Sequence, residues 1–82
     1  MTPATMRHAL RHTARAALQG RCDEAEMRYS AAVRAFTLSA ENWSAKDRTR
    51  LWRLRERAKA AFMFCLVGPG APRRGLAGGL MR

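Results

Sequence analysis

The chain has 82 residues, of which 48% are hydrophobic, and its formal net charge is +10. This length excludes more than one domain, and so thin a core predicts either marginal stability or assembly with a partner, with an oligomer as a further option. The charge favours an anionic partner, which would be an acidic protein surface, nucleic acid or anionic lipid. Because most of the basic residues are arginine and alanine is abundant, the alternative is a charge that reflects only composition.

The first predicted helix spans residues 4–19. Thr2 is a favourable N-cap, Pro3 suits the first helical position, and Gly20 is predicted to cap the C-terminus. The apolar stripe of this helix consists of Met6, Leu10, Ala14 and Ala17. A second stripe is basic, with i, i+4, i+8 spacing, and consists of Arg7, Arg11 and Arg15. We interpret the basic stripe as a candidate anion-binding site.

The second predicted helix spans residues 23–40 and is slightly acidic. Asp23 and Glu26 have the spacing of a capping box, in which the aspartate accepts amide hydrogen bonds and the glutamate reaches back. The apolar stripe of this helix consists of Ala25, Tyr29, Ala32, Val33 and Phe36. Since small residues let two helices approach closely, we expect Tyr29 to fill the core between the first and second helices.

The third predicted helix spans residues 44–66. Ser44 is its expected N-cap, and Asp47 follows three positions later, where an acid favours a helix start. At about 100° per residue, one arc of this helix is apolar. The arc consists of Leu51, Leu54, Ala58, Ala61, Phe62 and Cys65. One flank of the arc carries Lys46, Arg50, Arg53 and Arg57, and the other carries Arg48, Arg55 and Lys59.

These elements define the expected fold class. No segment shows the alternation of a strand between turn signals, so the sequence predicts an all-α fold. Residues 1–67 should form a small three-helix bundle, made of a helical hairpin plus a third, basic helix. Residues 68–82 open with Gly-Pro-Gly and have little apolar bulk, which predicts a disordered, flexible Gly/Pro/Arg tail.

Trp52 is the most informative residue of the third helix. It falls outside the apolar arc, beyond the flank that carries Arg48, Arg55 and Lys59. Exposed tryptophan beside arginine is typical of interface hot spots, so we interpret these four residues as a candidate partner-binding site. Stacking on an unpaired base is a second interpretation. A purely structural alternative is that Trp52 packs against the tail or Trp43.

The sequence offers little support for catalysis or for metal binding. His8 and His12 have the i, i+4 spacing of a metal pair, and Cys22 is a conceivable third ligand. No acidic residue lies nearby in the sequence to complete the set, and the arginine stripe beside it disfavours a cation. No nucleophile–base pair and no phosphate loop is recognisable. We therefore expect no enzyme activity, no cofactor and no metal site.

Cysteine usage and hydropathy lead to an expectation about location. Cys22 and Cys65 are too few for a disulfide scaffold, and no secretory signal is present. The apolar run over residues 60–67 is too short to span a bilayer. These features predict a protein in a reducing compartment, by default the cytoplasm. Residues 1–21 are arginine-rich and free of acids, as in mitochondrial transit peptides, so mitochondrial targeting is the alternative.

The segment from Gly20 to Val33 has the pattern G-x-x-x-E-A-x-x-x-Y-x-x-A-V. Over residues 9–33 this pattern resembles one tetratricopeptide repeat, with Ala25, Tyr29 and Ala32 at the small, aromatic and small positions. Residues 4–66 are also similar in layout to MIT domains, which are three-helix bundles. Both resemblances imply a protein that binds other proteins. The MIT-like layout further implies a partner helix or extended segment held in a groove between helices.

The sequence therefore predicts a small basic adaptor that binds an acidic or amphipathic segment of another protein. Nucleic-acid binding by the basic faces of the first and third helices is the alternative function.

Overall fold

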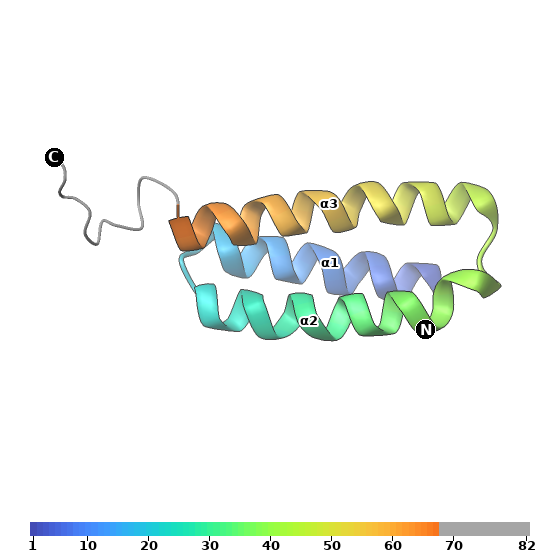
Figure 1. The fold of residues 1–82 in the computed structure, drawn as a ribbon, viewed down its shortest axis with the longest axis horizontal. Coiled ribbons are helices and arrows are strands. Elements are labelled where there is room, and N and C mark those ends of the chain that lie inside the picture. Colours follow the sequence, from blue (N-terminus) through green and yellow to red (C-terminus); the bar gives the residue numbers. More distant parts are fainter. Residues whose placement is uncertain (68–82) are drawn as a thin grey trace, which may run out of the picture.

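The computed structural model describes residues 1–67, which form three helices connected by short turns (Figure 1). The helices are α1 (Pro3–Leu18), α2 (Cys22–Ser39) and α3 (Ala45–Val67), with a short 3-10 turn, η1 (Ala40–Asn42), before α3. Within this part of the chain there is no strand, so the predicted all-α three-helix bundle is confirmed. The predicted tail at residues 68–82 lies outside the described residues. Because α2 reverses direction, α1 and α3 run parallel.

The starts of α1 and α3 follow the predicted capping chemistry. The Oγ1 of Thr2 accepts a hydrogen bond from the Thr5 amide at 3.1 Å, and Pro3 occupies the first turn. The Oγ of Ser44 accepts one from the Asp47 amide at 3.1 Å. Each side chain satisfies an amide that the helix itself leaves without a partner. These two helix starts are therefore fixed by local sequence.

The turn between α1 and α2 is built around Gly20, whose φ is +80°. Its amide donates to the Ala17 carbonyl at 3.0 Å, and the Arg21 amide donates to the Ala16 carbonyl at 2.9 Å. This pair of bonds is a Schellman motif, which requires a left-handed residue that glycine adopts without strain. The predicted role of Gly20 is confirmed.

The predicted capping box at the start of α2 is wrong. α2 begins at Cys22, and its N-cap residue, Arg21, makes no side-chain capping bond. The Arg21 carbonyl already accepts the Ala25 amide at 2.9 Å, so Asp23 lies inside the helix rather than at its cap. The tight Schellman turn leads straight into α2 and leaves no extended residue at Asp23. Its charge still favours the helix through the dipole.

The main core lies between the three helices and under η1. It consists of Met6, Leu10, Ala32, Phe36, Trp43, Leu51 and Ala58. Trp43, in the connection before α3, is only 6% exposed and meets Phe36 edge-on at 5.1 Å between ring centres. Its Nε1–H donates to the Met1 carbonyl at 3.0 Å. Trp43 therefore closes one end of the bundle, which helix periodicity did not predict because it lies outside the helices.

The opposite end of the bundle has a smaller core, made of Ala16, Ala17 and Ala25. Here a disulfide joins Cys22 at the start of α2 to Cys65 near the end of α3, with 5.8 Å between the Cα atoms. The sequence offered too few cysteines for a disulfide scaffold and did not predict this bond, because only helix packing brings residues 43 apart in sequence to the same end. Disulfides persist mainly in oxidising compartments. The expected location in the cytoplasm, which is a reducing compartment, stays a prediction. No helix in residues 1–67 is long and apolar enough to cross a membrane.

The sequence predicted that Tyr29 fills the core between α1 and α2, but the structure places its ring elsewhere. It is half-buried and stacks on Phe62 of α3, with 5.7 Å between ring centres and 26° between ring planes. The ring packs against the edge of the main core. The small residues Ala16 and Ala25 are buried together nearer the disulfide end of α1 and α2. The ring lies instead in the seam between α2 and α3.

Candidate binding surfaces

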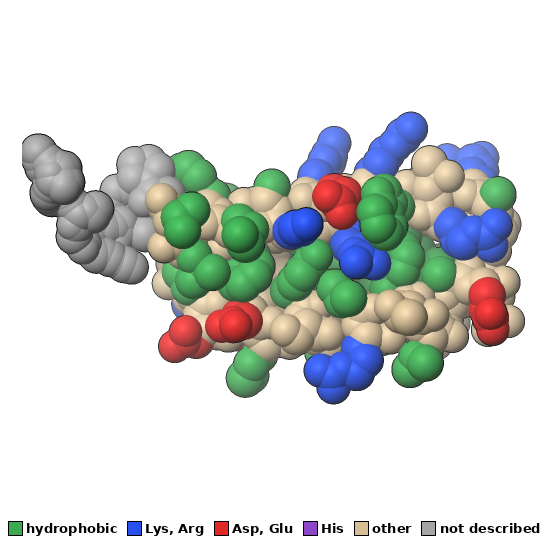
Figure 2. All heavy atoms as spheres, in the orientation of Figure 1, with side chains coloured by type: hydrophobic (Ala, Val, Ile, Leu, Met, Phe, Trp, Pro, Cys, Tyr) green, Lys and Arg blue, Asp and Glu red, His purple; other side chains and the backbone are tan. Residues whose placement is uncertain are grey.

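α3 carries a different candidate surface on each flank. Toward α2 lies the Trp52 surface, which we define as Trp52, Arg48, Arg55 and Lys59 of α3. Toward α1 lies the arginine groove, whose residues are given below. Figure 2 shows apolar side chains gathered along the seam between α2 and α3, with basic side chains among them.

Trp52 is 49% exposed, so its predicted position outside the core is confirmed. Its ring meets Phe36 of α2 edge-on, with 6.0 Å between ring centres. The guanidinium carbon of Arg55 lies 4.6 Å from the centre of the Trp52 ring. The indole thus rests on α2 and Arg55 while about half of it faces solvent. Its role in binding a partner stays a prediction.

Arg48 and Lys59 differ from Arg55 in what they contact. The Nη1 of Arg48 donates to the Trp43 carbonyl at 2.6 Å and to the Ala40 carbonyl at 3.4 Å. Arg48 therefore closes the connection between η1 and α3, which reduces its freedom to reach a partner. Lys59 is exposed and makes no ion pair within residues 1–67.

The arginine groove runs between the parallel helices α1 and α3 and comprises two adjoining hollows. The first, of about 570 Å³, is lined by Leu10, Arg11, Ala14, Arg15, Leu18, Gln19, Leu54, Arg57 and Ala58. The second, of about 500 Å³, is lined by Pro3, Arg7, Arg11, Asp47, Arg50, Leu51, Arg53, Leu54 and Arg57. Because Arg11, Leu54 and Arg57 belong to both, the hollows form one continuous groove.

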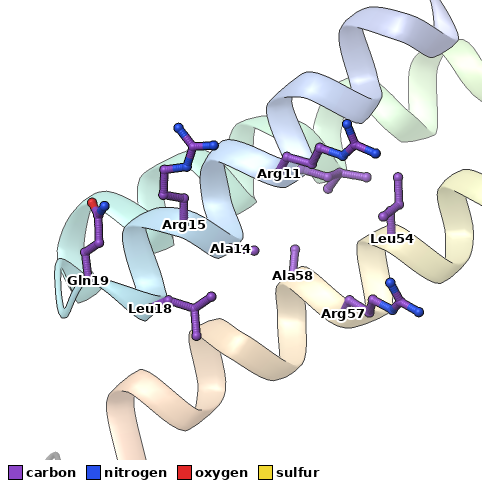
Figure 3. A pocket seen from close by; sticks show the side chains of 9 residues that line it. Arg11, Ala14, Arg15, Leu18, Gln19, Leu54, Arg57 and Ala58 are labelled. Carbon is purple, nitrogen blue, oxygen red and sulfur yellow. The ribbon is translucent and has the colours of Figure 1, made fainter.

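Apolar side chains lie between the helices and arginines lie at the rims of the groove. Figure 3 shows Ala14 and Leu18 of α1 beside Leu54 and Ala58 of α3, while the arginine heads point outward. Leu18 is 78% exposed, so part of this apolar floor is open to solvent. The rim arginines are Arg7, Arg11 and Arg15 of α1 and Arg50, Arg53 and Arg57 of α3. The predicted anion-binding stripe of α1 is one rim of this groove.

The six rim arginines make no ion pair within residues 1–67. The ion pairs within residues 1–67 are those of Glu24 with Arg21 and with Arg28, both at 2.8 Å and both outside the groove. Asp47 is the one acidic residue that lines the groove, and it makes no ion pair in the described part of the chain. Along α1, successive rim arginines are about 6 Å apart, since four residues rise by that amount. The groove therefore presents two rows of positive charge.

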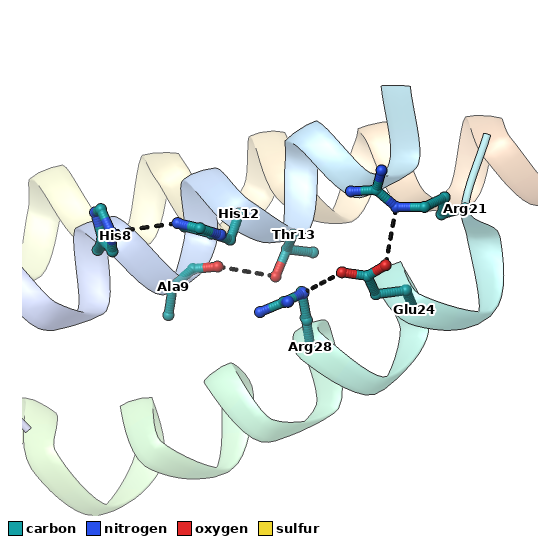
Figure 4. A network of polar contacts seen from close by, with 7 residues as sticks. All are labelled: His8, Ala9, His12, Thr13, Arg21, Glu24 and Arg28. Atoms are coloured by element: carbon teal, nitrogen blue, oxygen red, sulfur yellow. Dashed lines mark hydrogen bonds and ion pairs between the residues drawn. The ribbon is translucent and has the colours of Figure 1, made fainter. Parts of the chain in front are cut away.

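A polar network lies on the outer side of α1 and α2 (Figure 4). The Nε2 atoms of His8 and His12 are 3.2 Å apart, within hydrogen-bonding distance. Desolvation lowers the pKa of His12, and the positive charges of His8, Arg28 and Arg15 add to this effect. Protonation of His12 is therefore disfavoured, and the same positive charges disfavour a metal cation. Within residues 1–67, no group of three or more metal-ligating side chains gathers.

Glu24 should titrate below the ordinary range of a glutamate. Its hydrogen bond from Arg28 is the largest cause of the lowered pKa, and the charge of Arg21 adds to it. Because the pKa is lowered in the folded state, Glu24 contributes stability above its unfolded-state pKa, and this contribution is lost as pH falls through the folded value. A titration followed by the side-chain carboxyl carbon in NMR measures the shift. Titration at the ordinary value, unchanged in Arg28→Gln, would contradict the pairing.

No protein-family model, curated protein or solved structure matches this chain. The tetratricopeptide-like and MIT-like resemblances therefore stay predictions, and the candidate surfaces are interpreted from their own chemistry.

The signal that could have located the groove is the helix wheel, which already placed Arg50, Arg53 and Arg57 on one flank. What it could not give is the parallel packing that sets this flank beside the basic stripe of α1.

Proposed function

We propose that this protein is a binding module that holds an acidic, amphipathic helix of a partner protein in the arginine groove. The observation that carries the proposal is the pair of arginine rows, free of ion pairs within residues 1–67, on either side of an apolar floor. This arrangement has the chemistry of a helix-in-groove site.

A partner helix with leucines or alanines on one stripe and glutamates on both flanks would complement the groove. Its apolar stripe would cover Leu54 and Leu18, and the glutamates would pair with the arginine rows. This layout is that of coiled-coil interfaces, where charged residues flank an apolar seam and determine partner choice. Arginine suits the role because its planar head forms two parallel hydrogen bonds with a carboxylate.

Nucleic-acid binding is the second candidate function. The regular spacing of Arg7, Arg11 and Arg15 and the net charge of +10 suit a row of phosphates. The floor of the groove, however, offers alanine and leucine rather than the aromatic rings on which unpaired bases stack. The apolar floor favours a peptide over a nucleic acid.

Fluorescence anisotropy with four labelled probes tests the proposal. The glutamate peptide is a helical peptide with a leucine stripe flanked by glutamates, and the glutamine peptide replaces each glutamate by glutamine. The other two probes are a DNA duplex and a single-stranded RNA of random sequence. We expect the glutamate peptide to bind at least about 10-fold more tightly than the glutamine peptide, a difference of about 1.4 kcal/mol.

The nucleic-acid probes decide between the two candidate functions. At about 150 mM salt we expect both to bind more weakly than the glutamate peptide. If either binds more tightly there, and its affinity falls steeply between about 50 and 200 mM salt, counterion release from phosphates is the dominant contribution. That result would reverse the ranking.

A further inference from the structure

Arg55 lies between two aromatic rings on the flank of α3 that faces away from the arginine groove. Its guanidinium carbon is 5.2 Å from the centre of the Phe36 ring and 4.6 Å from that of Trp52. The two rings are themselves 6.0 Å apart and meet at 71°. Contacts of this kind attract a cation to the ring face and fix the plane of the guanidinium. Arg55 is therefore held in one orientation by α2 and α3 together.

The hydrogen-bonding groups of Arg55 are unequally placed. Its Nε is buried and has no hydrogen-bond partner in residues 1–67. Within residues 1–67, its two terminal groups, Nη1 and Nη2, make no hydrogen bond and no ion pair. An unpaired buried donor is costly, so native proteins retain few of them. The two rings hold the head of Arg55 in place, and its terminal groups have no partner within residues 1–67.

We propose that Arg55 is a receptor for a carboxylate of an acidic peptide segment, with a neighbouring apolar side chain of that segment packing on Trp52. The two terminal groups of a guanidinium match the two oxygens of a carboxylate. The exposed half of the Trp52 ring supplies apolar area beside the charge, as in interface hot spots. Because the side chains of Arg55 and Trp52 already hold each other in place, they lose little rotamer freedom when the peptide segment binds.

The surroundings favour one carboxylate over a phosphate chain. Arg48, one of the nearby cations, is held by the carbonyls of Trp43 and Ala40. A nucleic acid needs a row of cations, and the row lies in the arginine groove on the other flank of α3. This second surface goes beyond the proposed function, which uses the groove alone.

Two short probes that differ in a single charge test the proposal in the full-length protein. They are acetyl-Leu-Glu-Leu-amide and its neutral counterpart, acetyl-Leu-Gln-Leu-amide. NMR signals of the Arg55 guanidinium and the Trp52 indole N–H report binding at the site. We expect the glutamate probe to shift both signals and to bind at least about 5-fold more tightly than the glutamine probe, because charged hydrogen bonds are the stronger kind.

Matched variants separate the site from general charge. Arg55→Lys keeps the charge but loses the planar head, and should weaken the preference for glutamate. Arg53→Lys makes the same change two residues away at the groove rim and should leave the preference intact. Arg11→Glu, which damages the groove, should also leave it intact, so that failure of the groove and failure of this site are distinguishable. Thermal unfolding of each variant shows that it is folded.

Three results would overturn the proposal. The first is equal affinity for the glutamate and glutamine probes, and the second is an unchanged glutamate preference in folded Arg55→Lys. The third is that a single-stranded oligothymidylate shifts the Arg55 and Trp52 signals at a lower concentration than the glutamate probe requires. That third result would assign the site to nucleic acid.

Discussion

Replacing Cys22 with serine should lower the free energy of unfolding by about 4 kcal/mol, as expected from chain entropy for a cross-link that closes a loop of this length. The disulfide joins residues 43 apart in sequence and holds the end of α3 against the start of α2. The core at this end consists of three alanines, which contribute little apolar area. For a domain of this size, the loss corresponds to a fall in melting temperature of about 15–30 °C.

Thermal unfolding under oxidising conditions measures the effect. Cys65→Ser and the double variant should behave like Cys22→Ser, because all three lack the same bond. Wild-type protein in excess reductant should lose the same stability. Two reactive thiols in folded wild-type protein purified without reductant, together with an unchanged melting temperature in Cys22→Ser, would show that the bond does not form.

Trp43→Ala should destabilise the protein by about 3–5 kcal/mol, the usual cost of truncating a buried large aromatic residue. The ring is 6% exposed, packs edge-on against Phe36, and donates its Nε1–H to the Met1 carbonyl. The substitution leaves a cavity at the end of the bundle opposite the disulfide. For a domain this small, the loss approaches the whole free energy of unfolding.

Trp52→Ala is the matched control for this prediction. It removes the same side chain from a position that is 49% exposed, so its cost should be much smaller. Denaturant unfolding of both variants at one temperature gives the comparison. Equal losses of stability would mean that Trp52 belongs to the core and that α3 is rotated relative to the described packing.

Features that depend on neighbours in sequence could be predicted. The caps at Thr2 and Ser44 and the left-handed turn at Gly20 each involve groups within five residues, and all three are present. The capping box at Asp23 failed although it is also local. There the helix begins at Cys22, directly after the Schellman turn, so Asp23 lies inside the helix and cannot be its N-cap.

Features that depend on how the helices pack were beyond the sequence. The disulfide requires that the start of α2 and the end of α3 meet, and the Tyr29–Phe62 stack requires the register of α2 against α3. Trp43 has no helical periodicity, so no stripe identified it as a core residue.

The candidate surfaces likewise combine features that the sequence predicts with features that depend on how the helices pack. Helix periodicity predicted that Trp52 lies outside the core and that arginines line both flanks of α3. It did not predict that Arg55 is held between Phe36 and Trp52, since Phe36 comes from α2. Nor did it show that the arginines of α1 and α3 face one groove, which follows from the parallel course of these helices.

The central claim is that the arginine groove, rather than overall charge, binds an acidic helix. The most direct test compares the affinity of the glutamate peptide for Arg11→Glu, at the middle of the groove, and for Arg34→Glu, an exposed position on α2. Both variants change the net charge equally. The groove predicts that Arg11→Glu weakens binding by at least about 10-fold, or about 1.4 kcal/mol, while Arg34→Glu changes it by less than about 2-fold. Equal weakening in the two variants would contradict the claim and leave only non-specific attraction to a basic protein.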